Sequence, residues 1–410
     1  MSDRTRRVVL VSRIFAPEAA AATFRLGALV RALAERAHVR VLTSNPPPAL
    51  REVTPSSQVS SAGAEVSRWP VLRDATGYVR GYLPYLSFDL PLALRLLAER
   101  GPDVVVVEPP PTTGAVTRVA LAARGLVGTR VPYVYYAADI WSDATASMGA
   151  PAPVVSGIRW VERFALRGAR DVVAVSEGVA ERVRALAGPD TPVTVVPNGI
   201  DTEVFTPEGQ VHPEAPGTPY LVYAGTASEW QGAEIFAKAM REVVREEPDA
   251  RLIFLGQGSS WPALQQIRDE LPGGVIELRP LVPPEEAAAW QRGAAAALVS
   301  VRPGVGYDFA YPTKVIAAVA SGAPVVFAGP GPAAADVAEH GLGEAVGYDV
   351  AQVAQAMLAA VRAHRAGRDA AALAHRVGWA RTHRSLAATG VAAAAVVLDG
   401  CERSHSGEAG

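Results

Sequence analysis

The stretch VVLVSRIFAPEAAAATFRLGALVRALAERAHVRVLT, from Val8 to Thr43, decides the fold. It begins and ends with short β-branched runs, Val8 to Ser12 and Val39 to Thr43, which predict buried strands. Between them, Ala21 to Arg36 carries leucine and valine at helical spacing and predicts a helix with one apolar face on a sheet. A strand, a helix and a second strand in this order form a βαβ unit, the building block of a parallel sheet.

The same alternation continues along the chain. In the first half, further strands are predicted at Val104 to Val107, Tyr133 to Ala137, Val172 to Ser176 and Val193 to Val196. A second series is predicted at Leu221 to Ala224, Leu252 to Leu255, Val275 to Leu278, Ala297 to Val301 and Pro324 to Phe327. Residues 206–219 are rich in proline and glycine and have no apolar periodicity, which is typical of a linker. The sequence therefore predicts two doubly wound α/β domains, with ligands in a cleft at the carboxyl ends of the strands.

Composition narrows the class of protein. The 410 residues are 49% hydrophobic and 20% charged, which suits a chain with two real cores and not a disordered one. The net charge of −2 lacks the basic excess of a nucleic-acid-binding protein, so no nucleic acid partner is expected. The single cysteine, Cys401, excludes an intrachain disulfide. Because the apolar runs are too short for a signal peptide or a membrane span, we expect a cytoplasmic protein.

The run Val196-Pro197-Asn198-Gly199-Ile200-Asp201, with Val204-Phe205 behind it, stands at the end of the first predicted domain. Taken alone, Asn198-Gly199 predicts a turn, because both residues tolerate positive φ. The run resembles the PNG(I/V)D…F signature of a large family of retaining glycosyltransferases, group 1 or family four, which includes bacterial polysaccharide and lipid-linked sugar transferases. The resemblance touches nearly the whole chain and is weakest from residue 49 to residue 98.

This resemblance implies the GT-B fold, two Rossmann-like doubly wound parallel-sheet domains that face a cleft. Residues 1–205 would form the N-terminal, acceptor-side domain, and 206–219 the linker. Residues 220–378 would form the C-terminal, nucleotide-sugar-binding domain. A helix over 379–400 would cross back to the N-terminal domain, and 401–410 would be a tail.

Two glycine-containing turns in the second domain suggest a diphosphate site. Gly225 and Thr226 follow a predicted strand, and Gln231-Gly232 opens a predicted helix, so backbone amides there could meet phosphate. The alternative is that the glycine only tightens a βα turn. In the family this segment reads G…KG, and Gln231 here takes the place of the lysine.

The run Tyr311-Pro312-Thr313-Lys314, together with Ala320-Ser321-Gly322-Ala323-Pro324-Val325-Val326, resembles the family's donor-binding helix, P-S-K-L…E-x-M-A-x-G-x-P-V. Lys314 is one of only two lysines in the chain, and a compact ammonium suits a diphosphate that must leave. The alternative is a solvated lysine at a helix start. Where the family has a glutamate that holds the ribose, this chain has Ala317.

The remaining donor contacts are carried over from the family pattern. Gly256 lies in a loop that resembles one of the two loops holding the base through main-chain groups, and Leu281 lies in the other. Arg302 would assist Lys314 in balancing the charge of the leaving group. Pro312 and Thr313 complete the donor-binding set.

In the first domain, Phe15-Ala16-Pro17-Glu18 with Arg25 resembles the family's F-P-P-E…R loop, and Ala138-Asp139-Ile140-Trp141 resembles its D-x-W-P run. Glu18 and Asp139, with Lys314, are the predicted catalytic residues, and Arg25 and Asn198 are predicted on the acceptor side. A local ion pair at a helix start is the alternative for Glu18 and Arg25.

The resemblance implies transfer of a sugar, with retention, from a nucleotide-diphosphate donor, a UDP-sugar, to a hydroxyl of a glycan, a lipid-linked saccharide or a natural product. No cofactor and no metal are expected, because no Asp-x-Asp run or ligand cluster with metal spacing occurs. Ala317 and Gln231 leave open a catalytically inactive protein that only binds nucleotide-sugar. A nicotinamide-dependent oxidoreductase is disfavoured, since no glycine lies between Ser12 and Glu18.

One aromatic and basic stretch suggests peripheral contact with the inner face of a membrane and a lipid-linked acceptor. An ordinary core-facing helix and loop is the alternative. The residues of this stretch are Arg73, Tyr78, Arg80, Tyr82, Tyr85, Phe88 and Arg95.

Overall fold

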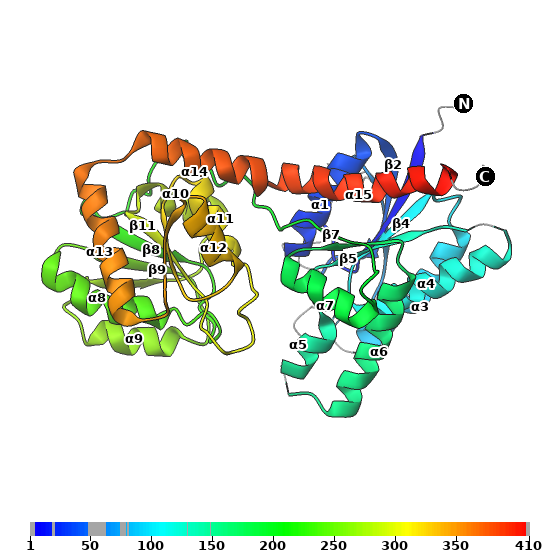
Figure 1. Ribbon diagram of the computed structural model, residues 1–410, viewed down its shortest axis with the longest axis horizontal. Coiled ribbons are helices and arrows are strands. Elements are labelled where there is room, and N and C mark those ends of the chain that lie inside the picture. The colour runs from blue at the N-terminus through cyan, green and yellow to red at the C-terminus, as the bar shows by residue number, and fades with distance from the viewer. Residues whose placement is uncertain are drawn as a thin grey trace. The chain divides into compact units, whose positions relative to one another are not determined.

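The computed structural model describes residues 5–18, 21–47, 63–73, 79, 82–128, 130–147 and 149–406. The chain forms two compact units. The first consists of residues 1–198 and 386–410, and the second of residues 199–385. Each unit has its own parallel sheet covered by helices (Figure 1).

The first unit contains a seven-stranded parallel sheet in its described residues, in the order β3-β2-β1-β4-β5-β6-β7. Its strands β4 and β6 are buried along their whole length, which their β-branched sequences suit. The strands are β1 Arg6–Val11, β2 Ala37–Ser44, β3 Glu65–Trp69, β4 Val104–Val107, β5 Tyr133–Ala137, β6 Asp171–Ala174 and β7 Val193–Val195. The helices are α1 Ala21–Ala34, α3 Tyr82–Ala98, α4 Pro111–Leu126, α5 Trp141–Ser147, α6 Ala152–Gly168, α7 Glu177–Ala187 and α15 Leu386–Ser406.

The second unit contains a six-stranded parallel sheet in the order β10-β9-β8-β11-β12-β13. In both units the strand order reverses beside the first strand, between β1 and β4 and between β8 and β11. The strands are β8 Tyr220–Ala224, β9 Arg251–Leu255, β10 Ile276–Arg279, β11 Ala296–Ser300, β12 Val325–Ala328 and β13 Gly343–Val346. The helices are α8 Glu234–Glu246, α9 Trp261–Asp269, α10 Pro284–Gly293, α11 Thr313–Ala320, α12 Pro332–Glu339, α13 Val350–Ala366 and α14 Ala370–His383.

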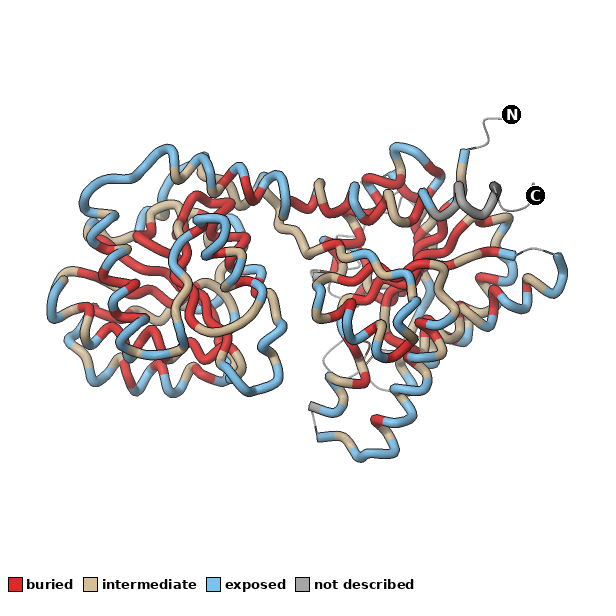
Figure 2. The backbone as a smooth tube through the Cα atoms, viewed as in Figure 1, coloured by how far each residue is buried: buried red, intermediate tan, exposed pale blue. Residues whose placement is uncertain are grey.

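Figure 2 shows that the strands of both sheets consist mainly of buried residues. The buried hydrophobic residues form two clusters in each unit. One cluster of the first unit joins distant parts of the chain, because Ala393, Val397 and Leu398 of α15 pack with Leu26 and Leu29 of α1. The two helices come so close that a Cβ added at Gly390 would lie 2.6 Å from the carbonyl oxygen of Ala28. The last helix is thus part of the first core.

The predicted fold class is confirmed, and every predicted strand is present within two residues of its expected bounds. Two strands were not predicted, β3 and β13, and both lie at sheet edges. Their sequences, EVSRW and GEAV, lack the continuous apolar run of a central strand and are partly exposed. An edge strand is covered less, so its sequence carries a weaker signal.

The chain between the predicted domains differs from the expectation in two respects. Residues 206–219, predicted as a linker, lie inside the second unit, which begins at Gly199. They are fastened to α10, since His212 stacks on Trp290 with ring centroids 4.4 Å apart and Arg292 Nε donates to the Gln210 carbonyl at 2.9 Å. In place of one helix over 379–400 there are two, α14 and α15, and between them the Arg384 carbonyl accepts from the Ile200 amide at 2.7 Å.

Candidate functional site

Lys314 lies in the first turn of α11, directly after the loop that follows β11. Its Nζ donates to the Tyr223 hydroxyl at 2.8 Å and to the Thr226 carbonyl, and it lies 4.4 Å from the centre of the Tyr223 ring. Among the described residues, no carboxylate forms an ion pair with it. Desolvation lowers the pKa of Lys314 to about 7. The Lys314 side chain is therefore only partly protonated near pH 7, and a bound anion would favour its charged form.

Glycines at the ends of β8 and β9 make room for this lysine. Gly225 has a φ of +118°, and a Cβ added there would lie 2.7 Å from Lys314 Cε. A Cβ at Gly256 would lie 2.0 Å from the Gly225 carbonyl oxygen. The Gly225 amide donates to the Leu255 carbonyl at 2.7 Å, so this amide already has a backbone partner. Gly225 and Gly256 contribute space and close backbone packing.

Gln231 and Gly232 close the turn before α8, which begins at Glu234 and not at the predicted Gln231. The buried Gln231 side chain accepts from the amide and the hydroxyl of Ser228, at 3.1 and 3.0 Å. Gly232 has a φ of +62°, and its carbonyl accepts from the Tyr348 hydroxyl at 2.7 Å. Gln231 Oε1 is thus used within the turn, where the family pattern has a lysine.

The other residues predicted around the donor lie on the same edge of the second sheet. Arg302 follows β11 and forms an ion pair with Glu234 at the start of α8, which partly neutralises its charge. Pro312 is the N-cap residue of α11, and Thr313 is its exposed first residue. Ala317 is 6% exposed, and Leu281, in the loop after β10, is 52% exposed.

In the first unit, a buried polar cluster lies where the strand order reverses, at the carboxyl ends of β1 and β4. Arg25 of α1 forms a buried ion pair with Glu108, and its second terminal nitrogen donates to Asn198 Oδ1 at 3.3 Å. Glu108 also accepts from the Ser12 hydroxyl at 2.8 Å. The structure therefore brings the predicted acceptor-side pair, Arg25 and Asn198, into contact.

The two predicted carboxylates of this unit have different surroundings. Glu18 is buried and faces Arg73, whose two terminal nitrogens each lie 3.3 Å from one of its oxygens. The alternative of a local pair between Glu18 and Arg25 is wrong, because each has a more distant partner in the sequence. Asp139 follows β5, and desolvation raises its pKa while Arg25 lowers it.

Sequence reasoning missed Glu108, Ser12 and Tyr223. Glu108 directly follows the strand Val104–Val107, so an acidic residue at a strand's carboxyl end was a signal that could have found it. Tyr223 lies within a strand and reads as core. Only its contact with Lys314 shows that the hydroxyl reaches the site.

The aromatic and basic stretch that suggested a membrane contact mostly faces inward. Phe88 is buried, Tyr85 packs against Trp141 with ring centroids 6.0 Å apart, and Arg95 donates to the Ser67 carbonyl at 2.7 Å. Tyr78, Arg80 and the Tyr82 side chain lie outside the described residues. Among the α3 residues whose burial is described, the exposed ones are five leucines and Ala98 instead.

Two features are absent from the part of the chain that the structure describes. None of the helices there combines the length and the apolar character needed to cross a membrane. In the same part of the chain, no three histidine, cysteine, aspartate or glutamate residues lie close enough together to hold a metal ion.

Family models match both units. One described as a glycosyl transferase 4-like domain matches residues 21–199, and one described as glycosyl transferases group 1 matches residues 218–363. D-inositol 3-phosphate glycosyltransferase of Nocardia farcinica is 29% identical over 284 residues, 63% of this chain and 60% of that protein. The protein of the same name from Pseudarthrobacter chlorophenolicus is 31% identical over 231 residues, 52% of this chain and 53% of that protein. The matches thus span less than two thirds of these relatives.

Solved structures resemble the whole chain. Anabaena HepE, solved in complex with UDP and glucose, has a TM-score of 0.65 at 15% identity, over 96% of this chain and 100% of that one. Trehalose 6-phosphate synthase from Burkholderia multivorans has a TM-score of 0.67 at 15% identity, over 99% of each chain. WaaG, a glycosyltransferase involved in lipopolysaccharide biosynthesis, has a TM-score of 0.64 at 15% identity, over 95% of this chain and 99% of that one. Because the matching family domains follow one another across both units, this chain belongs to the group 1 glycosyltransferases of GT-B fold.

Proposed function

We propose that this protein transfers a sugar from a UDP-sugar to a hydroxyl acceptor with retention of the anomeric configuration. The observation that carries the proposal is Lys314, a poorly solvated ammonium without a carboxylate partner among the described residues, held beside Tyr223 and Thr226. UDP is the nucleotide named with the HepE structure. When the bond between the sugar and UDP breaks, the β-phosphate gains one negative charge, which such a lysine could stabilise.

In this proposal the enzyme binds the departing diphosphate more strongly than the intact donor, and this difference accelerates transfer. The charge of Lys314 is restored by the diphosphate itself, so the interaction strengthens as the leaving group gains charge. The acceptor hydroxyl enters on the face from which the diphosphate departs. Lys314 supplies the positive charge in place of a metal, so activity should survive EDTA.

The acceptor side of the proposal rests on the cluster of Arg25, Glu108 and Asn198 and on Asp139 beside it. Carboxylate and amide groups at strand ends are suited to hold sugar or cyclitol hydroxyls. Since the curated relatives carry the name D-inositol 3-phosphate glycosyltransferase, inositol phosphates belong in the first acceptor panel. Glycans and lipid-linked saccharides complete it.

The assay combines a panel of UDP-sugars with this acceptor panel, and nuclear magnetic resonance of the product reports its anomeric configuration. A product with the donor's configuration supports the proposal, and an inverted product contradicts it. Lys314→Ala is expected to lower turnover by roughly two to three orders of magnitude while the fold survives. Full turnover in a folded variant would remove Lys314 from the mechanism.

The second candidate, a protein that binds nucleotide-sugar without transferring it, is favoured by two observations. Ala317 offers no carboxylate to the ribose, and Gln231 Oε1 is used by Ser228. Tight UDP-sugar binding with neither hydrolysis nor transfer, across all acceptors, would favour this candidate. Slow hydrolysis of the donor in the absence of acceptor would favour the enzyme.

We also propose that α3 and α4 rest on a membrane surface. Every exposed residue of these two helices is apolar, among those whose burial the structure describes, and the two helices pack together. Five leucines of α3 are 45–70% exposed, Leu83, Leu86, Leu90, Leu94 and Leu97. An exposed apolar helix face needs a cover, and a patch of this kind marks an interaction site.

Flotation with vesicles of phosphatidylglycerol and phosphatidylcholine tests this surface. Leu86→Gln with Leu90→Gln is expected to release the protein from the vesicles, whereas Val391→Gln, at an exposed position of α15, should not. Wild type that stays unbound and forms a dimer, which the double variant converts to a monomer, would show that a second copy covers the leucines instead.

A further inference from the structure

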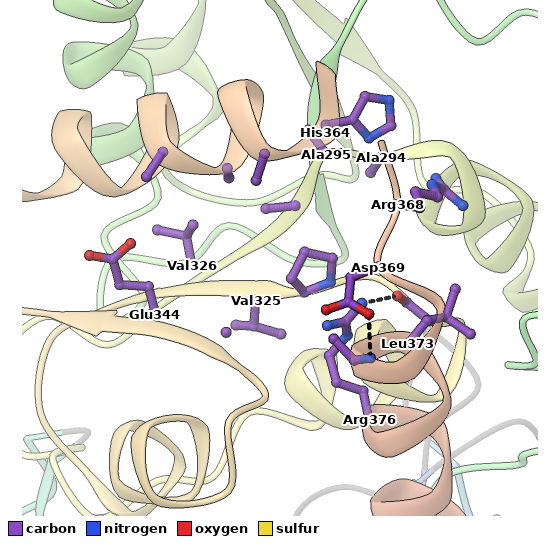
Figure 3. A pocket seen from close by; sticks show the side chains of 18 of the residues that line it. Ala294, Ala295, Val325, Val326, Glu344, His364, Arg368, Asp369, Leu373 and Arg376 are labelled. Atoms are coloured by element: carbon purple, nitrogen blue, oxygen red, sulfur yellow. Dashed lines mark hydrogen bonds between the residues drawn. The ribbon is translucent and has the colours of Figure 1, made fainter. Parts of the chain in front are cut away.

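A cavity of about 400 Å³ lies in the second unit at the edge of the sheet opposite Lys314 (Figure 3). It is bounded by the first residues of β11, β12 and β13, by α13 and by the start of α14. Since all these strands are parallel, their amino ends lie at the far edge from the loops that carry Gly225 and Lys314. The proposed donor site does not use this cavity.

The walls of the cavity are mostly apolar. Val325 and Val326 of β12 line it on the sheet side, and alanines 356, 359, 360 and 363 line it from α13. Such walls hold the body of an organic molecule without any directional contact. A volume of this size falls in the range of ligand pockets, about 300 to 1,000 Å³.

Cationic side chains lie at one end of this cavity. Arg376 of α14 donates one hydrogen bond, to the Gly322 carbonyl at 3.0 Å, and its buried Nε has no partner among the described residues. Arg368 and His364 lie around the turn from α13 to α14, and Figure 3 shows Glu344 on the side away from them, beyond Val326. Desolvation lowers the pKa of Arg376 and of His364, so neither group is well hydrated.

The arginines of α13 and α14 that lie outside the cavity form ion pairs. Arg362 and Arg365 of α13 form ion pairs with Glu246, Glu247 and Asp249, and Arg381 of α14 pairs with Glu208. Arg368 and Arg376 form no ion pair among the described residues. The nearby Asp369 accepts from the amides of Ala371 and Ala372, so its carboxylate caps α14. Asp369 also lines the cavity and its charge acts on Arg376, so two arginines and one carboxylate leave one net positive charge at this end.

We propose that this cavity is a second binding site, which takes a small organic anion with its acidic head on Arg376 and Arg368 and its apolar body against Val325 and Val326. A guanidinium binds a phosphate or a carboxylate through two parallel hydrogen bonds, and Arg376 Nε is free to make one of them. A ligand there would link α13, α14 and the sheet, and so stabilise the second unit.

Phenyl phosphate is the probe, and calorimetry with the full chain measures its binding. We expect saturable binding of one molecule to wild type, at least tenfold weaker binding to Arg376→Met, and unchanged binding to Arg362→Met, whose arginine lies on α13 outside the cavity. Ala360→Leu, which fills the cavity from α13, should abolish binding. UDP binding by each variant serves as the control for folding, because the donor site lies at the other edge.

Two further compounds test separately what the acidic head and the apolar body of phenyl phosphate contribute to binding. Inorganic phosphate and benzyl alcohol should each bind at least tenfold more weakly than phenyl phosphate. The proposal is overturned if phenyl phosphate does not saturate wild type by about 10 mM, a concentration at which even a weak site of roughly 1 mM would be mostly filled. It is equally overturned if Arg376→Met and Ala360→Leu, with UDP binding intact, bind the probe as wild type does.

Discussion

The protonation of Lys314 should control how tightly the free protein binds UDP. Because desolvation lowers the pKa of Lys314 to about 7, the side chain is charged below pH 7 and mostly neutral above it. A diphosphate beside the ammonium favours the charged form and raises this pKa again. UDP binding above pH 7 should therefore take up a proton, and the affinity should fall as the pH rises.

The size of the fall in UDP affinity follows from the change in the pKa of Lys314 when UDP binds. If bound UDP restores the pKa to the ordinary value of 10.5, the affinity falls tenfold for each pH unit between about 7 and 10.5. At pH 9 the loss is about 100-fold, or about 2.7 kcal/mol. For folding the sign is opposite: the unfolded chain holds the proton in this window, so the contribution of Lys314 to the free energy of unfolding rises with pH.

Calorimetry between pH 7 and pH 9, in buffers of different ionisation enthalpy, measures both the affinity and the protons taken up. Lys314→Met provides the control, because it should bind UDP more weakly at pH 7 and show no loss between pH 7 and pH 9. Lys314→Arg keeps a charge throughout this range and should also lack the slope. A flat wild-type affinity from pH 7 to pH 9 would refute the reasoning that Lys314 meets the diphosphate in a poorly solvated site.

Three single variants and one double variant test the surroundings of the proposed donor and acceptor sites. Gly225→Ala is expected to weaken UDP binding at least tenfold, because the new Cβ would lie 2.7 Å from Lys314 Cε at a φ of +118°, and an unchanged dissociation constant would contradict this close approach. Arg25→Met should lower the free energy of unfolding by about 3–5 kcal/mol by leaving Glu108 buried and unpaired. Glu108→Gln added to it should recover most of that loss in urea unfolding. Ala317→Glu should cost about 1–3 kcal/mol, because position 317 is only 6% exposed, and a thermal melt equal to wild type would show that the carboxylate reaches solvent.

Local sequence patterns predict most of the strands of the fold. The strands at the centre of each sheet are apolar runs such as Val104–Val107, and their burial on both faces leaves the signal unambiguous. The edge strands Glu65–Trp69 and Gly343–Val346 lack that signal, since one side of each has no neighbouring strand. At the break between α14 and α15, Arg384 and Ser385 pair with Ile200, about 180 residues away in the sequence, and no local pattern predicts this pairing.

The candidate sites also contain some residues that local motifs predict and others that only the folded chain brings together. Lys314 and Gly225 belong to short motifs that keep their spacing, so the sequence could point to both, and the structure adds why a glycine is needed there. The pair of Arg25 and Glu108 joins residues 83 positions apart and depends on the packing of α1 against the sheet. The cavity of the second unit is lined largely by alanines, which carry no chemical signal of their own.

The packing of α15 on α1 has a consequence for the synthesis of this protein. The first unit receives the helix that completes its core only after the whole second unit has been made, at Leu386. At about 5–20 residues per second, the ribosome takes roughly 10 to 40 s to bridge that interval. During this time Leu26 and Leu29 of the nascent chain lack their final cover. A chaperone that shields apolar surface on nascent chains should therefore raise the yield of this protein more than that of a variant with the residues of α15 moved ahead of β1.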